Sequence, residues 1–235
     1  MRPSALQFVL VFGFALPLAA QSSQSAADFA GLARYRDENA QLPAVDTGRV
    51  VFMGNSITEG WAPLFGNFFP GRPYVGRGIS GQTTAQMLLR FRQDVIGLRP
   101  QAVVILAGTN DIAGNTGSAT LEEIRDNIAS MADLARANGI RVVLCSVLPV
   151  YDYPWKRGLE PAGKILTLNS WLREYARTRD AVYVDFHSAM KDERDGLRSE
   201  YTYDGVHATE AGYRTMSALV EQGIAAALAN RRTRP

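Results

Sequence analysis

The sequence predicts an α/β fold: a three-layer α/β/α sandwich around a flavodoxin-like parallel sheet of five strands in the order 2-1-3-4-5. Short, continuous apolar runs recur along the chain, as is typical of strands that are covered on both faces. Helical stretches separate these runs, which favours parallel strands joined by right-handed crossovers. The chain has 235 residues, of which 46% are hydrophobic and 20% charged, so it can form one such domain with a substantial core.

The expected elements alternate along the chain. We expect strands over residues 49–53, 102–107, 140–147 and 181–185, and a weaker second strand that starts at residues 73–75. We expect helices over residues 84–98, 121–137, 161–177 and 209–230, and a weaker helical spacing over 26–42. Thr120 and Glu123 form a capping-box pattern in front of the helix at 121, and Asn138-Gly139 is a stop signal behind it.

The first 20 residues have the pattern of a secretory signal peptide. Arg2 supplies a positive charge, residues 5–18 are apolar, and Ala19 and Ala20 precede a polar stretch, so we expect cleavage after Ala20. The apolar segment is short for a membrane span, which needs about 20 residues, although an uncleaved signal anchor is an alternative. The mature protein is therefore expected to be exported, to the periplasm or the medium, without stable insertion in a membrane.

The remaining chain is expected to divide into a tether with an N-terminal helix over 21–48 and a single domain over 49–235. Lys and Arg number 25 against 23 Asp and Glu, and no Lys/Arg-rich run appears, so we expect no nucleic-acid partner. Cys145 is the only cysteine, which excludes an internal disulfide and a multi-cysteine zinc or iron–sulfur site.

Residues that can carry chemistry gather where the expected strands end. Three segments follow the first three strands, and a fourth follows the last strand after a loop: Gly54-Asn55-Ser56-Ile57-Thr58, Gly78-Ile79-Ser80-Gly81-Gln82, Gly108-Thr109-Asn110-Asp111 and Asp204-Gly205-Val206-His207. Ligands of open parallel sheets bind beyond the carboxyl ends of the strands, so we expect these four segments to meet there.

These segments, in this order, resemble the SGNH hydrolase superfamily, also called the GDSL esterase/lipase family, over essentially the whole mature chain. The resemblance implies that Ser56 is the nucleophile and that His207 is its base, oriented by Asp204. It also implies an oxyanion hole made by the backbone N–H groups of Ser56 and Gly81 and the side chain of Asn110. Two positions depart from the family pattern: Asn55 replaces the usual Asp, and Gly76 stands where relatives often have Asn.

The chemistry of these residue types agrees with the implied roles. A serine hydroxyl needs a neighbouring base to become a nucleophile, and His207 can accept its proton. Asp204, three residues before His207, can reach the other ring nitrogen and fix the tautomer. Fixed N–H donors at Gly81 and Asn110 would stabilise the oxyanion of a tetrahedral intermediate. No cofactor or metal is expected for this mechanism.

Other interpretations of the polar residues are possible. His187 is the other of the two histidines, and we expect it to be structural or at most to contact substrate. Asp185, His187, Asp204 and His207 could instead hold a metal, as in a metal-dependent phosphoesterase. That interpretation leaves Ser56, Gly81 and Asn110 unexplained.

The resemblance implies a serine esterase that hydrolyses short acyl esters, above all acetyl esters, of carbohydrate or aryl alcohols through an acyl-enzyme. We expect Trp61, Tyr153, Trp155 and Tyr203 to contact a small-molecule or carbohydrate ester, because aromatic rings at a strand-end rim can stack on sugar or aryl groups. Ordinary lid packing is the alternative role for these rings. Alternative functions are a lipid or thioester acylhydrolase of the same superfamily and a secreted, non-catalytic carbohydrate-binding protein on the same scaffold.

Overall fold

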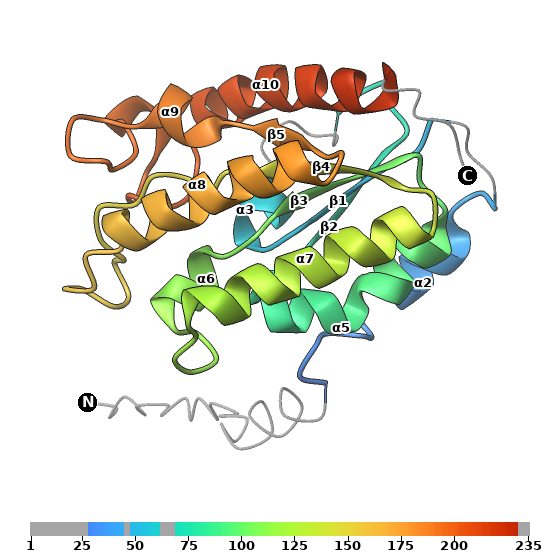
Figure 1. The fold of residues 1–235 in the computed structure, drawn as a ribbon, viewed down its shortest axis with the longest axis horizontal. Helices are drawn as coiled ribbons and strands as arrows, with labels where there is room; N and C mark the ends of the chain where they lie inside the picture. The colour runs from blue at the N-terminus through green and yellow to red at the C-terminus, as the bar shows by residue number, and fades with distance from the viewer. Residues whose placement is uncertain (1–27, 45–47, 62–68, 230–235) are drawn as a thin grey trace, which may run out of the picture.

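A computed structural model describes residues 28–44, 48–61 and 69–229, and the predicted signal peptide lies outside these ranges. One parallel sheet of five strands forms the centre of the described structure, in the order β2-β1-β3-β4-β5 (Figure 1). The strands are β1 Val50–Gly54, β2 Tyr74–Gly78, β3 Ala102–Leu106, β4 Arg141–Cys145 and β5 Val182–Val184. The predicted fold class and strand order are therefore confirmed.

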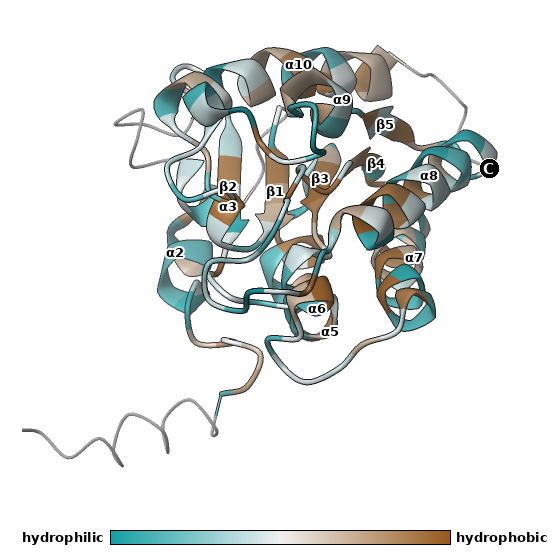
Figure 2. Cartoon of the chain, turned by 90° about the vertical axis from the view of Figure 1, so that its left-hand side faces the viewer, coloured by the Kyte–Doolittle hydropathy of each residue, from teal (hydrophilic) through white to brown (hydrophobic). Residues whose placement is uncertain are grey.

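Helices cover both faces of the sheet. The described α-helices are α2 Arg36–Gln41, α3 Ser56–Glu59, α5 Thr84–Asp94, α6 Thr109–Ala113, α7 Leu121–Ala137, α8 Ala162–Thr178, α9 Phe186–Met190 and α10 Glu210–Ala229. Helices α5, α7 and α8 pack on one face, and α9 and α10 pack on the other. Figure 2 shows the hydrophobic strands between these two helical layers.

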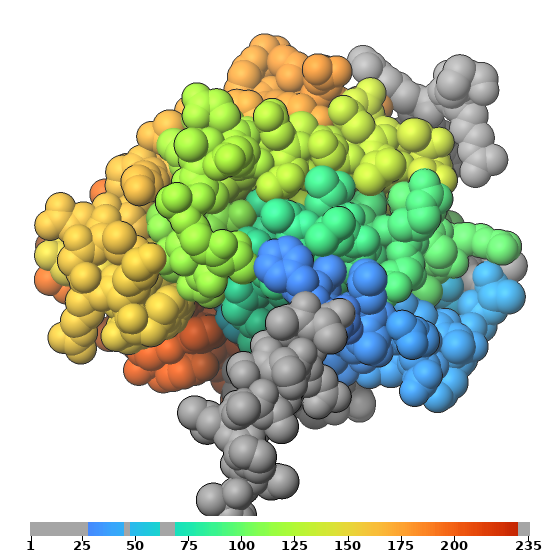
Figure 3. All heavy atoms as spheres, turned by 90° about the horizontal axis from the view of Figure 1, so that it is seen from below, coloured from blue at the N-terminus to red at the C-terminus, as the bar shows by residue number. Residues whose placement is uncertain are grey.

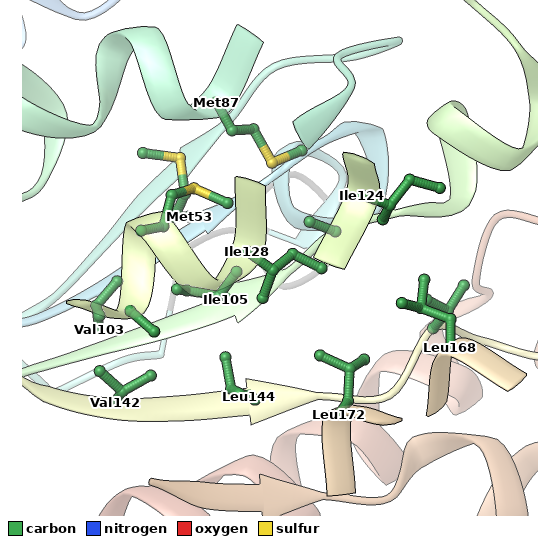
Figure 4. Close-up of a cluster of buried hydrophobic side chains, with 14 of the residues drawn as sticks. Met53, Met87, Val103, Ile105, Ile124, Ile128, Val142, Leu144, Leu168 and Leu172 are labelled. Carbon is green, nitrogen blue, oxygen red and sulfur yellow. The ribbon is translucent and has the colours of Figure 1, made fainter. Parts of the chain in front are cut away.

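The alternation of side chains along each strand supplies a core to both layers. Val51 and Met53 of β1 belong to the core under α5, α7 and α8, whereas Val50 and Phe52 belong to the core under α9 and α10. Figure 4 shows the first core, where Met53 and Met87 lie above the strands near Ile128. Burying one such side chain contributes about 1.5–3 kcal/mol, so these two layers stabilise the sheet edge on which the polar segments lie.

The predicted helix over 121–137 is confirmed with the same bounds. Thr120 and Glu123 form the capping box, and Gly139 behind the helix has a φ of +69°. The helix predicted over 84–98 instead ends at Asp94, and a short 3-10 helix, Ile96–Leu98, follows it. Gly97 is a poor helix former and Pro100 disfavours helical backbone at the residue before it, which explains the early end.

The second strand, of which only the start at residues 73–75 was predicted, is Tyr74–Gly78. It runs to Gly78 because its pairing with β1 continues through Gly76 and Gly78. Glycine has low strand propensity, so the sequence pattern did not indicate these paired residues.

The N-terminal segment, residues 28–44, packs on α5 (Figure 3). Its helix is only α2, Arg36–Gln41, and turns replace the earlier part of the predicted helical stretch. Glutamine side chains hold the turns: Gln82, Gln86 and Gln93 donate to backbone carbonyls in the segment, each at 2.7 Å. Among the described residues, no helix is long and apolar enough to cross a membrane.

Candidate active site

Ser56 lies just beyond the carboxyl end of β1, at the first residue of the short helix α3. Asn55 caps this helix, because its Oδ1 accepts a hydrogen bond from the Ile57 N–H at 3.1 Å. Tyr213 of α10 donates its hydroxyl to the Ile57 carbonyl at 2.7 Å. The turn is therefore fixed from two sides, while the Ser56 side chain remains partly exposed.

A chain of hydrogen bonds joins Ser56, His207 and Asp204. Ser56 Oγ lies 3.0 Å from His207 Nε2, and His207 Nδ1 lies 2.6 Å from Asp204 Oδ2. In such a line the imidazole can accept the hydroxyl proton while the carboxylate fixes the imidazole tautomer. The structure thus brings together the three residues to which the sequence analysis gave these roles.

Asp204 is held as an anion by the turn that it closes. Burial raises the pKa of its carboxyl group, but hydrogen bonds from the His207 backbone and ring and from Val206 outweigh that effect, so the pKa lies below its usual value. Oδ1 accepts the Val206 N–H at 2.9 Å and the His207 N–H at 2.7 Å. Thr202 donates its hydroxyl to the His207 carbonyl at 2.7 Å, which fixes the same turn from its other end.

Gly81 follows β2 with a φ of +78°, in the left-handed region that favours glycine. A Cβ built at this position would meet no other atom closer than Asn115 Nδ2, at 4.0 Å. The backbone conformation, and not crowding, therefore requires a glycine here. Asn115 also donates to the Gly81 carbonyl at 3.2 Å, and Gly81 itself is exposed.

Asn110 lies buried in α6, directly after β3. Its Nδ2 donates to the Gln82 carbonyl at 3.0 Å. An amide nitrogen carries two N–H groups, so this bond leaves the second one for a ligand. Because Gln82 follows Gly81, the same bond joins the two segments that carry the predicted oxyanion donors.

Asp111 is a structural member of the site that the sequence analysis left without a role. Its carboxylate oxygens each accept the Thr84 N–H at 3.0 Å, and Oδ1 accepts the Thr84 hydroxyl at 2.5 Å. Burial raises the pKa of Asp111, and the hydrogen bonds from Thr84 oppose this shift. Asp111 thereby fixes the start of α5, three residues after Gly81. Its position directly after Asn110 was the one feature of the sequence that could have indicated a role in the site.

Two of the four aromatic residues predicted to contact substrate are buried, which argues against that role for their side chains. Trp61 is 1% exposed and packs against Phe52 and Tyr213 in the core under α10. Tyr153 is fully buried and donates its hydroxyl to the Thr109 carbonyl at 2.9 Å. The sequence places both residues near a strand end but does not show which way their side chains face.

The other two aromatic residues flank the imidazole of His207. Tyr203 is 70% exposed, and its ring lies 5.9 Å from the His207 ring at an interplanar angle of 13°. Trp155 is 47% exposed, with its ring 6.1 Å from the same imidazole. Both rings therefore lie beside His207, and both side chains remain accessible to solvent.

A pocket of about 360 Å³ has Asp204 and Gly205 in its wall. Its walls include Tyr151, Arg157, Arg194 and Leu197. Arg194 lies over the Tyr151 ring, with its guanidinium carbon 4.4 Å from the ring centre. The walls thus offer an aromatic face together with charged hydrogen-bonding groups.

His187 is buried and takes no part in the hydrogen-bonded line of Ser56, His207 and Asp204. Its backbone N–H donates to Ser146 Oγ at 2.9 Å, and its ring Nε2 has no hydrogen-bond partner in the described part of the chain. Burial lowers the pKa of His187; Asp195 and Asp185 oppose this shift and Lys191 adds to it. Across residues 28–44, 48–61 and 69–229, no group of three or more His, Cys, Asp or Glu could hold a metal ion.

Comparison with known proteins gives the same family as the motifs. The model of the GDSL-like lipase/acylhydrolase family matches residues 52–215. The crystal structure of a GDSL-like lipase from Bacteroides thetaiotaomicron is 49% identical, with a TM-score of 0.82 over 85% of this chain and 99% of that one. The likeness thus extends to nearly the whole of that enzyme.

Curated relatives are more distant. An acetylxylan esterase of Xylanibacter ruminicola is 25% identical over 219 residues, and the lipoprotein YqeF of Bacillus subtilis is 33% identical over 81 residues. The matches cover 77% and 33% of this chain but only 44% and 33% of those relatives' own lengths. Because the family model spans more than half of the chain, the protein belongs to the GDSL-like lipase/acylhydrolase family, the SGNH hydrolases.

Proposed function

We propose that the protein hydrolyses short acyl esters, above all acetyl esters, of carbohydrate or aryl alcohols, with Ser56 as nucleophile and His207 and Asp204 as its base and orienting acid. The observation that carries the catalytic part is the continuous line from Ser56 Oγ through His207 to Asp204, with distances of 3.0 Å and 2.6 Å. This contact geometry is that of a serine hydroxyl ready to lose its proton to an imidazole.

In the first step, Ser56 Oγ attacks the ester carbonyl and its proton passes to His207 Nε2. The carbonyl π electrons move to oxygen, and the N–H groups of Ser56, Gly81 and Asn110 stabilise that charge. Collapse of the tetrahedral intermediate breaks the bond to the alcohol oxygen, which takes the proton from His207 and leaves as the free alcohol. Asp204 accepts the Nδ1–H throughout and stabilises the imidazolium.

In the second step, water attacks the acyl-serine. His207 removes a proton from the water, the same donors stabilise the second oxyanion, and the Ser56–acyl bond breaks with return of the proton to Ser56 Oγ. The acid leaves and the enzyme is restored. The proton that left with the alcohol is thus replaced by one from water, so the two steps balance.

The exposed faces of Trp155 and Tyr203 support a sugar or aryl alcohol as the leaving group, because flat ring faces stack on such groups. The pocket of about 360 Å³ beside Asp204 has room for part of that alcohol. The acetylxylan esterase among the relatives supports acetyl sugars as substrates. Export is also proposed, on the signal-peptide pattern and the lipoprotein relative.

A single set of assays tests this proposal. A fluorophosphonate should label Ser56 alone, and Ser56→Ala should abolish both labelling and turnover while the fold is retained. A screen of aryl esters from acetyl to dodecanoyl, with acetylated xylo-oligosaccharides, then identifies the substrate class. A preference for long acyl chains or thioesters would favour a lipid or thioester acylhydrolase, and binding of sugars without turnover would favour a non-catalytic protein.

A further inference from the structure

Arg90, in the middle of α5, has no exposed surface and yet uses four hydrogen bonds. Its Nη1 donates to Asp94 Oδ2 at 3.1 Å, and its Nε donates to Gln82 Oε1 at 2.6 Å. Its Nη2 donates to two backbone carbonyls, those of Gly54 and Arg77, each at 2.9 Å. One guanidinium thus joins a helix, two strand ends and the loop after the second strand.

A contribution to stability alone does not explain why a buried arginine occupies this position. Burial lowers the pKa of Arg90, and Asp94 opposes this shift, so the cation is present at a cost that its partner offsets. A buried ion pair is often no more stabilising than well-packed apolar side chains of the same volume. The position of the group therefore needs another explanation.

The partners of Arg90 lie where the sheet stops fixing the backbone. Pairing between β1 and β2 ends at Gly54 and Gly78, one residue before Asn55 and Ile79. Beyond that point the two loops carry Ser56 and Gly81, whose N–H groups must point at one atom of the substrate. Arg90 binds the Gly54 carbonyl, the last of β1, and the Arg77 carbonyl, one residue before the end of β2.

Arg90 also reaches the third oxyanion donor. Gln82, whose side chain it binds, follows Gly81 directly, and the Gln82 carbonyl accepts Asn110 Nδ2 at 3.0 Å. The path Arg90–Gln82–Asn110 therefore links the guanidinium to the amide after β3. Arg90 is therefore linked to all three donors of the proposed oxyanion hole. Ser56 lies two residues after Gly54, Gly81 lies one residue before Gln82, and Asn110 binds the Gln82 carbonyl.

We propose that Arg90 is the positioning residue of the oxyanion hole: it sets the relative placement of the Ser56, Gly81 and Asn110 donors without touching substrate. The inference rests on the proposed serine mechanism. Its physical basis is that transition-state donors act only when preorganised, and a displacement of about 1 Å can cost about a hundredfold in rate.

The test is Arg90→Lys, which keeps a cation beside Asp94 but cannot present a planar fork to Gln82 and both carbonyls. We expect kcat to fall by about 10–100-fold with KM nearly unchanged. The inhibition constant of a trifluoromethyl ketone that mimics the acetyl group should rise by the same factor as kcat/KM falls, because both measure the oxyanion hole.

Arg49→Lys is the matched control. Arg49 is also buried, at 3% exposure, and donates to the carbonyls of Leu98 and Pro43, each at 2.6 Å, at the opposite end of β1. We expect this variant to lose thermal stability and to keep kcat within about twofold, since no donor of the site depends on it. The concentration of active enzyme is measured by the end point of fluorophosphonate labelling, and kcat is calculated per labelled site. Unfolded molecules of either variant therefore do not lower the measured kcat.

An unchanged kcat per labelled site in Arg90→Lys, or an equal loss of kcat in Arg49→Lys, would overturn the role of Arg90. A loss of turnover without a matching rise in the inhibition constant would also overturn it. Failure of the underlying mechanism is distinguishable, because it would be seen as turnover in Ser56→Ala, whatever Arg90 does.

Discussion

Asp204 holds His207 at two points with its two oxygens: Oδ1 accepts the backbone N–H at 2.7 Å, and Oδ2 lies 2.6 Å from ring Nδ1. One carboxylate therefore shapes the turn and orients the ring that the turn carries. Because a different oxygen makes each contact, a substitution at Asp204 can remove the contact to the ring and keep the contact to the backbone.

Asp204→Asn should separate these parts. The amide oxygen can still accept the backbone N–H, so we expect the melting temperature to change little, whereas the amide N–H₂ would face Nδ1 and favour the wrong imidazole tautomer. We expect kcat to fall by about 10³–10⁴ with KM nearly unchanged. Asp204→Ala, which loses both contacts, should in addition be less stable; full activity in Asp204→Asn would contradict the orienting role.

Asn110→Ala should lower kcat by about 10²–10³, the usual effect of removing one oxyanion donor that acts in the transition state. Steady-state kinetics on an aryl acetate measure this change. Asn138→Ala is the control, since Asn138 also donates its side-chain amide to a backbone carbonyl, that of Leu134 at the end of α7, but has no link to the donor segments. A rise in KM with kcat unchanged would mean that Asn110 only binds substrate.

The free energy of unfolding should fall as the pH falls into mild acid, because of the buried ring of His187. Because burial lowers its folded-state pKa, the unfolded chain binds a proton below about pH 6.5 that the folded chain does not yet bind. The stabilising contribution is therefore complete above this pH and is lost as the pH falls toward the lower folded pKa. Melting temperatures between pH 7.5 and 5.5 should fall less steeply in His187→Gln than in the wild type.

The same variant separates the two histidines in catalysis. His187→Gln should retain much of its activity at pH 7.5, whereas His207→Gln should be as inactive as Ser56→Ala. An inactive, folded His187→Gln would show that the base had been assigned to the wrong histidine. Equal pH slopes of melting temperature in the wild type and His187→Gln would contradict the buried, neutral state of that ring.

Trp155→Ala should lower kcat/KM for an acetylated xylo-oligosaccharide by about tenfold and for ethyl acetate by much less, because only the sugar uses the ring face. Acetyl esters should exceed octanoyl esters by at least about tenfold, which corresponds to about 1.4 kcal/mol. Leu89→Ala, at an exposed apolar side chain of α5, is the control. Equal losses on both substrates would contradict a stacking role for Trp155.

Much of the fold could be predicted because buried parallel strands have a plain signature: apolar runs such as residues 102–106 cannot lie at a surface. The short helices α3, α6 and α9 could not be predicted. They have four or five residues each, and a helical spacing of apolar residues needs more than two turns to be recognised. The direction of a loop side chain, as for Trp61, depends on tertiary packing that no local pattern contains.

Arg90 shows a signal that was present but not used. Met87, Arg90, Phe91 and Asp94 are all buried and follow the i, i+3, i+4, i+7 spacing of one helical face. An arginine and an aspartate on such a stripe must bind each other or the backbone, which marks them as structural or positioning groups. Their partners, by contrast, come from distant strands and could be known only from the folded chain.

The contact between Ser56 and His207 spans 151 residues, which has a consequence for folding kinetics. Contacts of large sequence separation form late, because the entropy of closing the intervening loop must be overcome first. Turnover can therefore begin only after the turn at 202–207 has docked on the sheet. Recovery of esterase activity after dilution from denaturant reports that docking event directly, and it should lag behind the regain of helical circular dichroism.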